Sequence, residues 1–94
     1  RIVVIEVNGK VVETYSLVKG MKPRQVRIDA GDGKYNVIYI QYDSVKVNSA
    51  SCPDQVCVHW GSISRVGQSI VCLPNKVVVK IMGSEAKEPV DDIT

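Results

Sequence analysis

The chain has 94 residues and an uneven set of apolar side chains, with 18 valines and 9 isoleucines against only 2 leucines and 3 alanines. Because branching at Cβ restricts a side chain in a helix but packs well on a pleated surface, this ratio excludes a coiled coil or helical bundle. No apolar run approaches the roughly 18 residues of a membrane-spanning helix. The length suits one domain with one modest core.

The charge is divided unevenly along the chain. The net charge is +2 and 45% of the residues are hydrophobic, a balance that permits a packed core. Residues 84–94 carry one positive and four negative charges, so we expect a flexible, polar, acidic tail there and a moderately basic domain over residues 1–83. The first residue is Arg rather than Met, which indicates a processed or trimmed chain from which an N-terminal anchor could have been lost.

The first predicted element is a hairpin, formed by residues 2–7 and 10–17 around Asn8-Gly9. Both turn residues tolerate positive φ, as a type I′ turn requires. Closing this turn predicts three cross-strand pairs: Val7 with Lys10, Ile5 with Val12, and Val3 with Thr14.

A second hairpin is predicted for residues 25–29 and 34–41, joined by the four-residue connection 30–33 with its two glycines. In its second strand, Ile38 and Ile40 point to one side and Val37 and Tyr39 to the other. A short strand at 44–47 follows.

The irregular segment 48–61 comes next, and then strands at 68–73 and 76–82 that flank a turn at Pro74-Asn75. Six to seven short strands with closely spaced turns predict an all-β domain, either a small β-barrel or a sandwich. We expect at most one short helical turn, near residues 53–57, because Pro53 can start a helix.

The chemically suggestive side chains gather in the irregular segment and just after it: Cys52, Cys57, His59, Trp60 and Cys72. Their first interpretation is a disulfide between Cys52 and Cys57, which would contribute about 2 kcal/mol and leave Cys72 unpaired. The second is a metal site of Cys52, Cys57, His59 and Cys72, a ligand set that suits zinc, although the usual C-x2-C spacing is absent.

A third interpretation rests on spacing. Cys57-Val-His59 and Cys72-Leu-Pro-Asn75 resemble the two ligand loops of a Rieske iron–sulfur protein, but Asn75 stands where the second histidine is required. The fourth is structural: Cys72 packs as a small hydrophobe in an apolar strand, and His59 hydrogen-bonds to nearby backbone.

Catalysis by a cysteine requires a base that holds the thiolate, and only His59 lies close to Cys57 in the sequence. On an extended chain the two side chains would share a face, but no acid stands in an obvious orienting role. We therefore expect no catalytic residue, no cofactor and no enzymatic activity.

A basic segment is the remaining candidate for binding. Lys19, Lys22, Arg24 and Arg27 fall within nine positions with no acid among them. Such a cluster can contact phosphate, as in nucleic acid. It can also be a solvated loop and edge strand, and aromatic residues for stacking on bases are sparse nearby.

Residues 52–81 read CPDQVCVHWGSISRVGQSIVCLPNKVVVKI, a run that resembles the signature of the NusG domain II family of small bacterial proteins. The family pattern contains Cys-Pro-x-x-x-Cys, Gly-x-Ile-Ser and Gly-Gln-x-Ile-Val-Cys-Leu-Pro-Asn-Lys. The matching positions are Cys52, Pro53, Cys57, Gly61, Ile63, Ser64, Gly67, Gln68, Cys72, Leu73, Pro74, Asn75 and Lys76. The resemblance implies a compact β-barrel and no established catalytic residue.

The resemblance also implies a protein with an N-terminal membrane anchor that faces outside the cell. An exported location favours a disulfide between Cys52 and Cys57, because thiols persist mainly in reducing compartments. We therefore expect a non-enzymatic interaction module with a protein partner, extracytoplasmic and membrane-tethered in its native form. The alternatives are a redox or metal-binding module at the cysteines and a nucleic-acid-binding module at residues 19–27.

Overall fold

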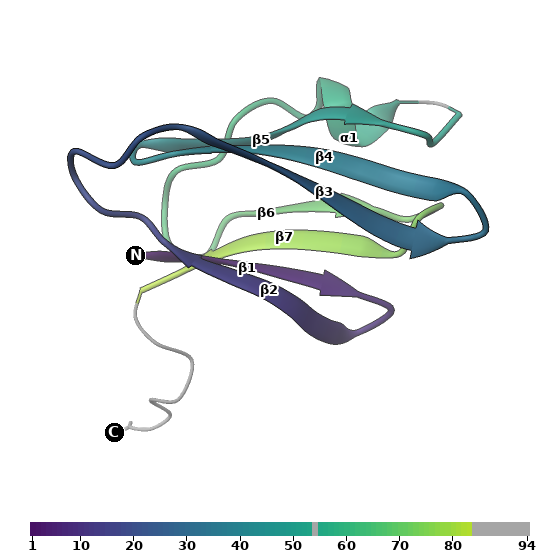
Figure 1. The fold of residues 1–94 in the computed structure, drawn as a ribbon, viewed down its shortest axis with the longest axis horizontal. Helices are drawn as coiled ribbons and strands as arrows, with labels where there is room; N and C mark the ends of the chain where they lie inside the picture. Colours follow the sequence, from purple (N-terminus) through teal and green to yellow (C-terminus); the bar gives the residue numbers. More distant parts are fainter. Residues whose placement is uncertain (54, 84–94) are drawn as a thin grey trace.

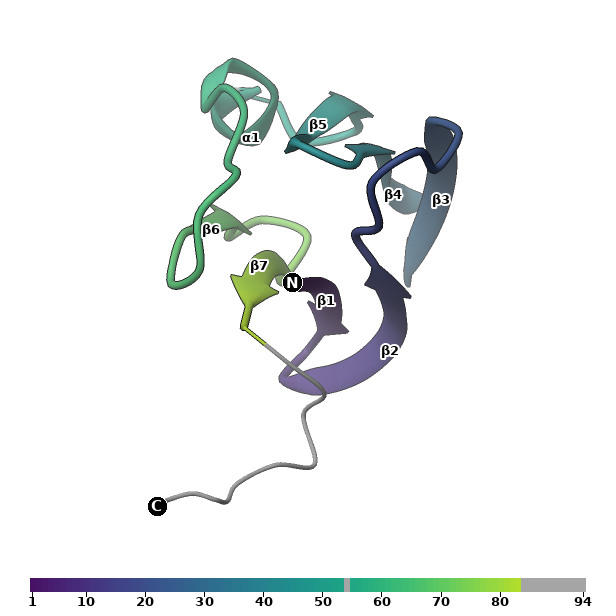
Figure 2. The same cartoon turned by 90° about the vertical axis from the view of Figure 1, so that its left-hand side faces the viewer.

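The fold is a sandwich of two antiparallel sheets, as seen in a computed structural model that describes residues 1–53 and 55–83. In chain order the elements are β1 (Ile2–Val7), β2 (Lys10–Ser16), β3 (Arg24–Gly31), β4 (Lys34–Gln41), β5 (Ser44–Ala50), α1 (Val56–His59), β6 (Ser69–Cys72) and β7 (Val77–Met82). One sheet has the order β2-β1-β7-β6 and the other β3-β4-β5, and they lie as two layers (Figures 1 and 2).

The all-β prediction is confirmed, and the structure decides between the two architectures that it allowed. Over the described residues the two sheets do not join edge to edge into a closed barrel, so the barrel implied by the family resemblance is replaced by an open sandwich. The expected acidic tail, residues 84–94, lies outside the described residues. No helix in the described part of the chain is long and apolar enough to cross a membrane.

The first hairpin forms around the predicted turn. Asn8 and Gly9 have φ of 56° and 81°, and Val7 faces Lys10 as expected. Further along, the predicted pairs are wrong by one residue. Ile5 faces Glu13 instead of Val12, and Val3 faces Tyr15 instead of Thr14, because a β-bulge between Ile5 and Glu6 leaves one extra residue on β2.

The second hairpin is tighter than predicted. Only Asp32 and Gly33 connect β3 to β4, with φ of 54° and 76°, so this is a second turn with two residues at positive φ. The pairing is irregular between Asp29 and Gly31, which accommodates the extra residue in β3. The strand expected at 44–47 extends to Ala50.

The core lies between the sheets and is built from the β-branched residues that the composition singled out. The strands β1 and β7 contribute one side and β4 and β5 the other, and the fully buried members are Val3, Ile5, Ile38, Ile40, Val45, Val77, Val79 and Ile81. The predicted alternation in β4 is confirmed, since Ile38 and Ile40 are buried and Val37 and Tyr39 are only half-buried.

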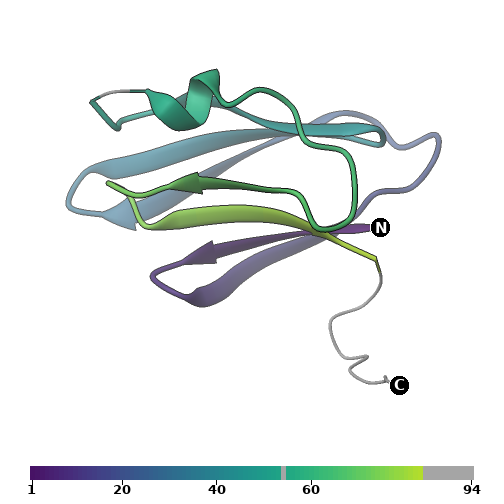
Figure 3. The same cartoon turned by 180° about the vertical axis from the view of Figure 1, so that it is seen from behind.

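The connection from β5 to β6 carries the chain from one sheet to the other (Figure 3). The helical turn expected near 53–57 forms slightly later, as α1. Gln55 explains the shift, because it adopts a left-handed φ of 56° that a helix cannot contain. After α1, Ile63 exchanges two backbone hydrogen bonds of 2.8 Å with Val45, which holds this connection along the edge of β5.

Candidate functional site

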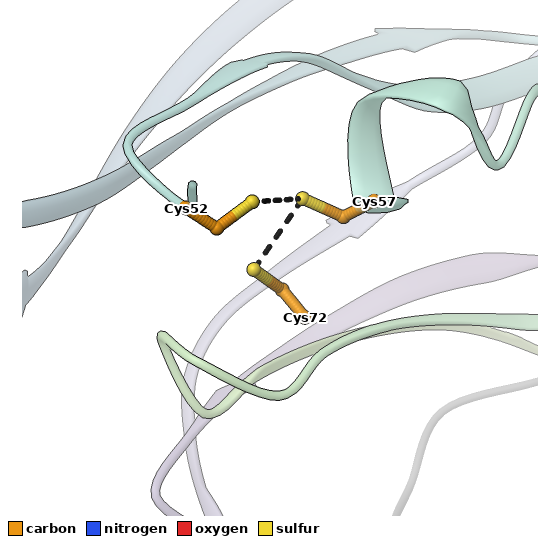
Figure 4. A group of neighbouring side chains, drawn as sticks. All are labelled: Cys52, Cys57 and Cys72. Carbon is orange, nitrogen blue, oxygen red and sulfur yellow. Dashed lines mark hydrogen bonds between the residues drawn. The ribbon is translucent and has the colours of Figure 1, made fainter. Parts of the chain in front are cut away.

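Three cysteines meet where the connection passes between the sheets. Cys52 follows β5, Cys57 lies in α1 and Cys72 is the last residue of β6. Their side chains point toward one another (Figure 4), with Sγ–Sγ distances of 3.3 Å from Cys57 to Cys52 and 3.3 Å from Cys57 to Cys72. All three are buried free thiols, and their sulfur atoms lie within 4.8 Å of one another.

The backbone on either side of Cys52 is fixed by local hydrogen bonds. The Gln55 side chain donates to the carbonyl oxygens of Ala50, at 2.8 Å, and of Cys52. Ser51 continues the β4 pairing, because its N–H donates to the Tyr35 carbonyl at 3.0 Å and its hydroxyl accepts from the Tyr35 N–H at 2.9 Å. These contacts hold the loop after β5 in the shape that turns Cys52 toward α1.

A buried pair of asparagines connects the thiols to the turn between β6 and β7. Asn36 and Asn75 are 0% and 3% exposed. The Asn75 amide donates to the Asn36 side-chain oxygen at 2.7 Å and to the Tyr35 carbonyl at 3.0 Å, and the Asn36 amide in turn donates to the Cys57 sulfur at 3.6 Å. The central sulfur of the cluster therefore has an amide donor aimed at it from the core.

Asn75 lies in the predicted turn, and its side chain points into the core. The turn at Pro74-Asn75 forms, with the Lys76 N–H donating to the Leu73 carbonyl at 3.1 Å and with Lys76 at a positive φ of 56°. The Asn75 side chain is an amide donor to the buried Asn36.

Burial sets the protonation state of the central thiol. It raises the pKa of Cys57, and the neighbouring Cys52 and Cys72 thiols raise that pKa further. A nucleophilic cysteine needs the opposite change, a lowered pKa next to a base or a cation. Cys57 in the metal-free, reduced protein is therefore a neutral thiol.

His59 does not join the cysteines. It lies two residues after Cys57 on a helix, where that spacing places side chains on different faces, and it is exposed. In the described part of the chain, the possible metal-ligating atoms that come together are the sulfurs of Cys52, Cys57 and Cys72 alone. Cys57 and His59 would share a face on an extended chain, and they do not do so here because the segment is helical.

The thiols form the floor of an apolar pocket. The pocket has a volume of about 230 Å³ and is lined by Cys52, Val56, Cys57, Trp60, Val71, Cys72, Leu73 and Pro74. Its rim is formed by exposed apolar side chains, with Val56 at 51%, Trp60 at 48% and Leu73 at 77%. An exposed apolar patch around a concave site is typical of a binding surface.

The four basic residues lie in the loop before β3 and on both faces of β3. Lys19 and Lys22 lie exposed in the loop before β3. Arg24 stacks over the ring of Tyr15 on β2, at 4.7 Å from its centroid, whereas Arg27 stacks over Tyr35 on β4 at 4.3 Å and pairs with Asp29 at 3.0 Å. Both arginines are thus engaged within the fold, on opposite faces of β3.

Two parts of this site were not predicted as site residues from the sequence, although Leu73 and Pro74 match the family pattern. Asn36 could have been found, because it occupies an inward position in the alternation of β4, next to Ile38 and Ile40, where a polar residue is unexpected. The rim of Val56, Leu73 and Pro74 has no such signal, since isolated apolar residues on a surface are ordinary.

The fold and the site together define a small two-sheet β domain with a buried three-cysteine cluster beneath an apolar pocket. The chain belongs to the NusG domain II family, whose model matches residues 1–85. No functionally curated protein matches it.

Solved structures of similar proteins support the same assignment. The chain is similar to the Lin0431 protein of Listeria innocua, with 34% identity, a TM-score of 0.80, and coverage of 89% of this chain and 97% of that one. It is also similar to the DUF1312 family protein EF3258 of Enterococcus faecalis, with 33% identity, a TM-score of 0.83 and coverage of 89% and 98%. A DUF1312 family protein of Ruminococcus gnavus is 45% identical, with a TM-score of 0.70 and coverage of 87% and 97%.

Proposed function

We propose that this domain is a non-enzymatic interaction module that holds an apolar side chain of a protein partner in the three-cysteine pocket. The observation that carries the proposal is the exposed rim of Val56, Trp60 and Leu73 around a concave, apolar floor. Side chains seated in such pockets at the centre of an interface supply most of its affinity.

The size of the pocket favours a protein side chain over a free small molecule. Its volume of about 230 Å³ falls below the roughly 300–1,000 Å³ of pockets that enclose organic ligands. Tryptophan is enriched at sites where protein partners bind, and Trp60 stands on the rim. A large apolar side chain of the partner would displace water from Leu73 and Trp60, which is the main source of binding free energy in this arrangement.

The chemistry of the thiols supports a non-enzymatic role. The raised pKa of Cys57 keeps this thiol protonated, and His59, the base nearest to it in sequence, is turned to the solvent. The proposal includes the extracytoplasmic, membrane-tethered setting that the family resemblance implies. Protease accessibility of the native full-length protein in intact cells tests that setting, and a protein that stays protected until the cells are lysed would contradict it.

Site-specific photocrosslinking in bacterial cells that carry the native full-length protein tests the partner. A benzophenone amino acid replaces Leu73 on the rim or, as a matched control, Val11, which is 58% exposed on β2 and lies outside the pocket. We expect one discrete protein adduct from position 73, no such adduct from position 11, and loss of the first adduct when Trp60→Glu is added. The same adducts from both positions, or none from position 73, would overturn the proposal.

A further inference from the structure

We propose that Cys52, Cys57 and Cys72 bind one thiophilic metal ion, Zn²⁺ or Cu⁺, through their three sulfur atoms at the floor of the pocket. This inference concerns the floor and does not depend on the protein partner proposed for the rim. It rests on the arrangement of the three sulfurs, on the buried amide aimed at the central one, and on access from the pocket.

The sulfurs form a triangle of the right size for one ion. Two sides are 3.3 Å and the third is at most 4.8 Å. The circle through such a triangle has a radius of at most about 2.4 Å, close to the 2.3 Å of a zinc–thiolate bond. An ion at or just above the centre of the triangle therefore reaches all three sulfurs with the backbone in place.

The same triangle is a poor arrangement for passing a disulfide among the three cysteines. In thiol–disulfide exchange the attacking sulfur approaches along the axis of the bond that it breaks, so three sulfurs lie nearly in line. Here the angle at Cys57 is at most slightly larger than a right angle, because the Cys52 and Cys72 sulfurs lie within 4.8 Å of each other. The geometry therefore suits one metal ion bound by all three sulfurs better than it suits transfer of a disulfide among them.

Asn36 provides the second, independent observation. This side chain is fully buried, yet its amide donates to a sulfur atom, which is a weak acceptor as a thiol and a stronger one as a thiolate. Its own oxygen is held by Asn75 at 2.7 Å, which fixes the direction of the amide. Donors of this kind commonly orient metal ligands and stabilise their charge.

The surroundings select soft metals. The pocket around the three sulfurs is lined by carbon from Val56, Val71 and Leu73 and by the ring of Trp60. Thiolate ligands prefer Zn²⁺ and Cu⁺ over Mg²⁺ or Ca²⁺, which require oxygen. Cu⁺ accepts three sulfurs as a complete set, whereas Zn²⁺ takes a fourth ligand, which here would enter from the pocket.

Binding is an exchange of protons for metal. Three S–H bonds break, three metal–sulfur bonds form, and three protons leave to the buffer, so the site becomes a Zn²⁺ complex with charge −1 or a Cu⁺ complex with charge −2. No electron is transferred in either case. The Asn36 amide lies against the sulfur that gains negative charge at the centre of the cluster.

Titration of the reduced, metal-free protein with Zn²⁺, Cu⁺ and, as a control, Mg²⁺ tests the proposal. Bound metal and released protons are measured together, and Co²⁺ serves as a spectroscopic substitute for zinc because sulfur-to-cobalt charge transfer reports thiolate ligation. We expect one equivalent of Zn²⁺ or Cu⁺ to bind and no binding of Mg²⁺. The ion that binds more tightly is the one that the site prefers. A stoichiometry well below one for both thiophilic ions would overturn the proposal.

Variants assign the ligands. Each of Cys52→Ser, Cys57→Ser and Cys72→Ser should weaken binding about 100-fold or more, and Asn36→Ala should weaken it about 10-fold and shift the cobalt charge-transfer band. His59→Ala, the matched control, should bind normally, and weakening by this change equal to that of a cysteine variant would contradict the three-sulfur site. If a variant fails to fold, protection of the wild-type thiols from alkylation by one equivalent of metal decides the matter.

The outcome is separable from that of the crosslinking experiment. A rim that crosslinks to a partner in cells while the floor binds no metal in vitro would reject the metal site and leave the interaction module in place. Metal binding without any partner adduct would do the reverse.

Discussion

The Asn75 side-chain amide donates a 2.7 Å hydrogen bond to the side-chain oxygen of Asn36, joining the turn between β6 and β7 to the first half of β4. Both side chains are buried, so this contact connects the two sheets through polar groups inside an otherwise apolar core. Buried polar groups of this kind are costly unless they are paired. The pair therefore constrains how the two sheets can be positioned relative to each other.

The first prediction concerns this pair. Asn36→Ala should lower the free energy of unfolding by about 2–3 kcal/mol, because it removes buried hydrogen bonds to Asn75 and to the Cys57 sulfur. Asn48→Ala is the matched control: Asn48 makes an exposed hydrogen bond to Gln25 at 3.3 Å, and its loss should change stability by no more than about 0.5 kcal/mol. Urea unfolding of the reduced proteins measures both, and equal effects would refute the structural role of Asn36.

The second prediction concerns pH. The pKa of Cys57 in the folded, metal-free protein lies above its ordinary value of 9.0, so above that pH the unfolded chain loses a proton that the folded chain keeps. The free energy of unfolding should therefore be unaffected by this group below pH 9.0 and should fall above it, by at most about 1.4 kcal/mol per pH unit. The difference between wild type and Cys57→Ser across this range isolates the effect, and parallel curves would contradict it.

A third prediction concerns oxidation. Both 3.3 Å sulfur contacts include Cys57, so glutathione disulfide should join Cys57 to one neighbour, releasing two glutathione molecules and leaving one free thiol. Alkylation followed by intact mass should show a single modified cysteine. Cys57→Ser should keep two alkylatable thiols under the same conditions. A disulfide between Cys52 and Cys72 in that variant would show that the cluster rearranges.

The fourth prediction separates the rim from the core. Leu73→Ser should change the free energy of unfolding by no more than about 0.5 kcal/mol, because the side chain is 77% exposed. Ile38→Ala, in the fully buried part of β4, should cost about 2–5 kcal/mol. Thermal or urea unfolding checks both. A large loss from Leu73→Ser would mean that the rim stabilises the fold and would weaken its assignment as a binding surface.

Much of the fold could be predicted because the turn residues and the alternation of apolar residues agree with the strand pairing that forms. The turn at Asn8-Gly9 and the alternation of Ile38 and Ile40 follow from the positive φ of a type I′ turn and from the period of a strand. The pairing of Ile5 with Glu13 instead of Val12 could not be predicted, since a β-bulge depends on how two strands pair and has no signal in the sequence of either strand alone.

The candidate site also has a part that could be predicted from the sequence and a part that could not. Cys52 and Cys57 were expected together because they are close in sequence, whereas the approach of Cys72 depends on how the connection after β5 folds back onto β6. The position of His59 depends on the short helix α1, which begins after the left-handed Gln55 and so forms later than the helical turn expected at residues 53–57. The concave surface above the sulfurs arises only when α1 and the end of β6 come together.

The connection from β5 through α1 to β6 places the three sulfurs on parts of the fold that belong to different sheets. Cys52 and Cys57 belong to the connection beside the three-stranded sheet, whereas Cys72 is part of the four-stranded sheet. A disulfide between Cys52 and Cys57 closes a small loop within the connection and leaves the two sheets free to separate at that end. A metal ion bound by all three sulfurs connects one sheet to the other, so it should slow amide hydrogen exchange in both α1 and β6. The disulfide-bonded and metal-bound forms would then differ in how often this end of the sandwich opens more than in their average structure.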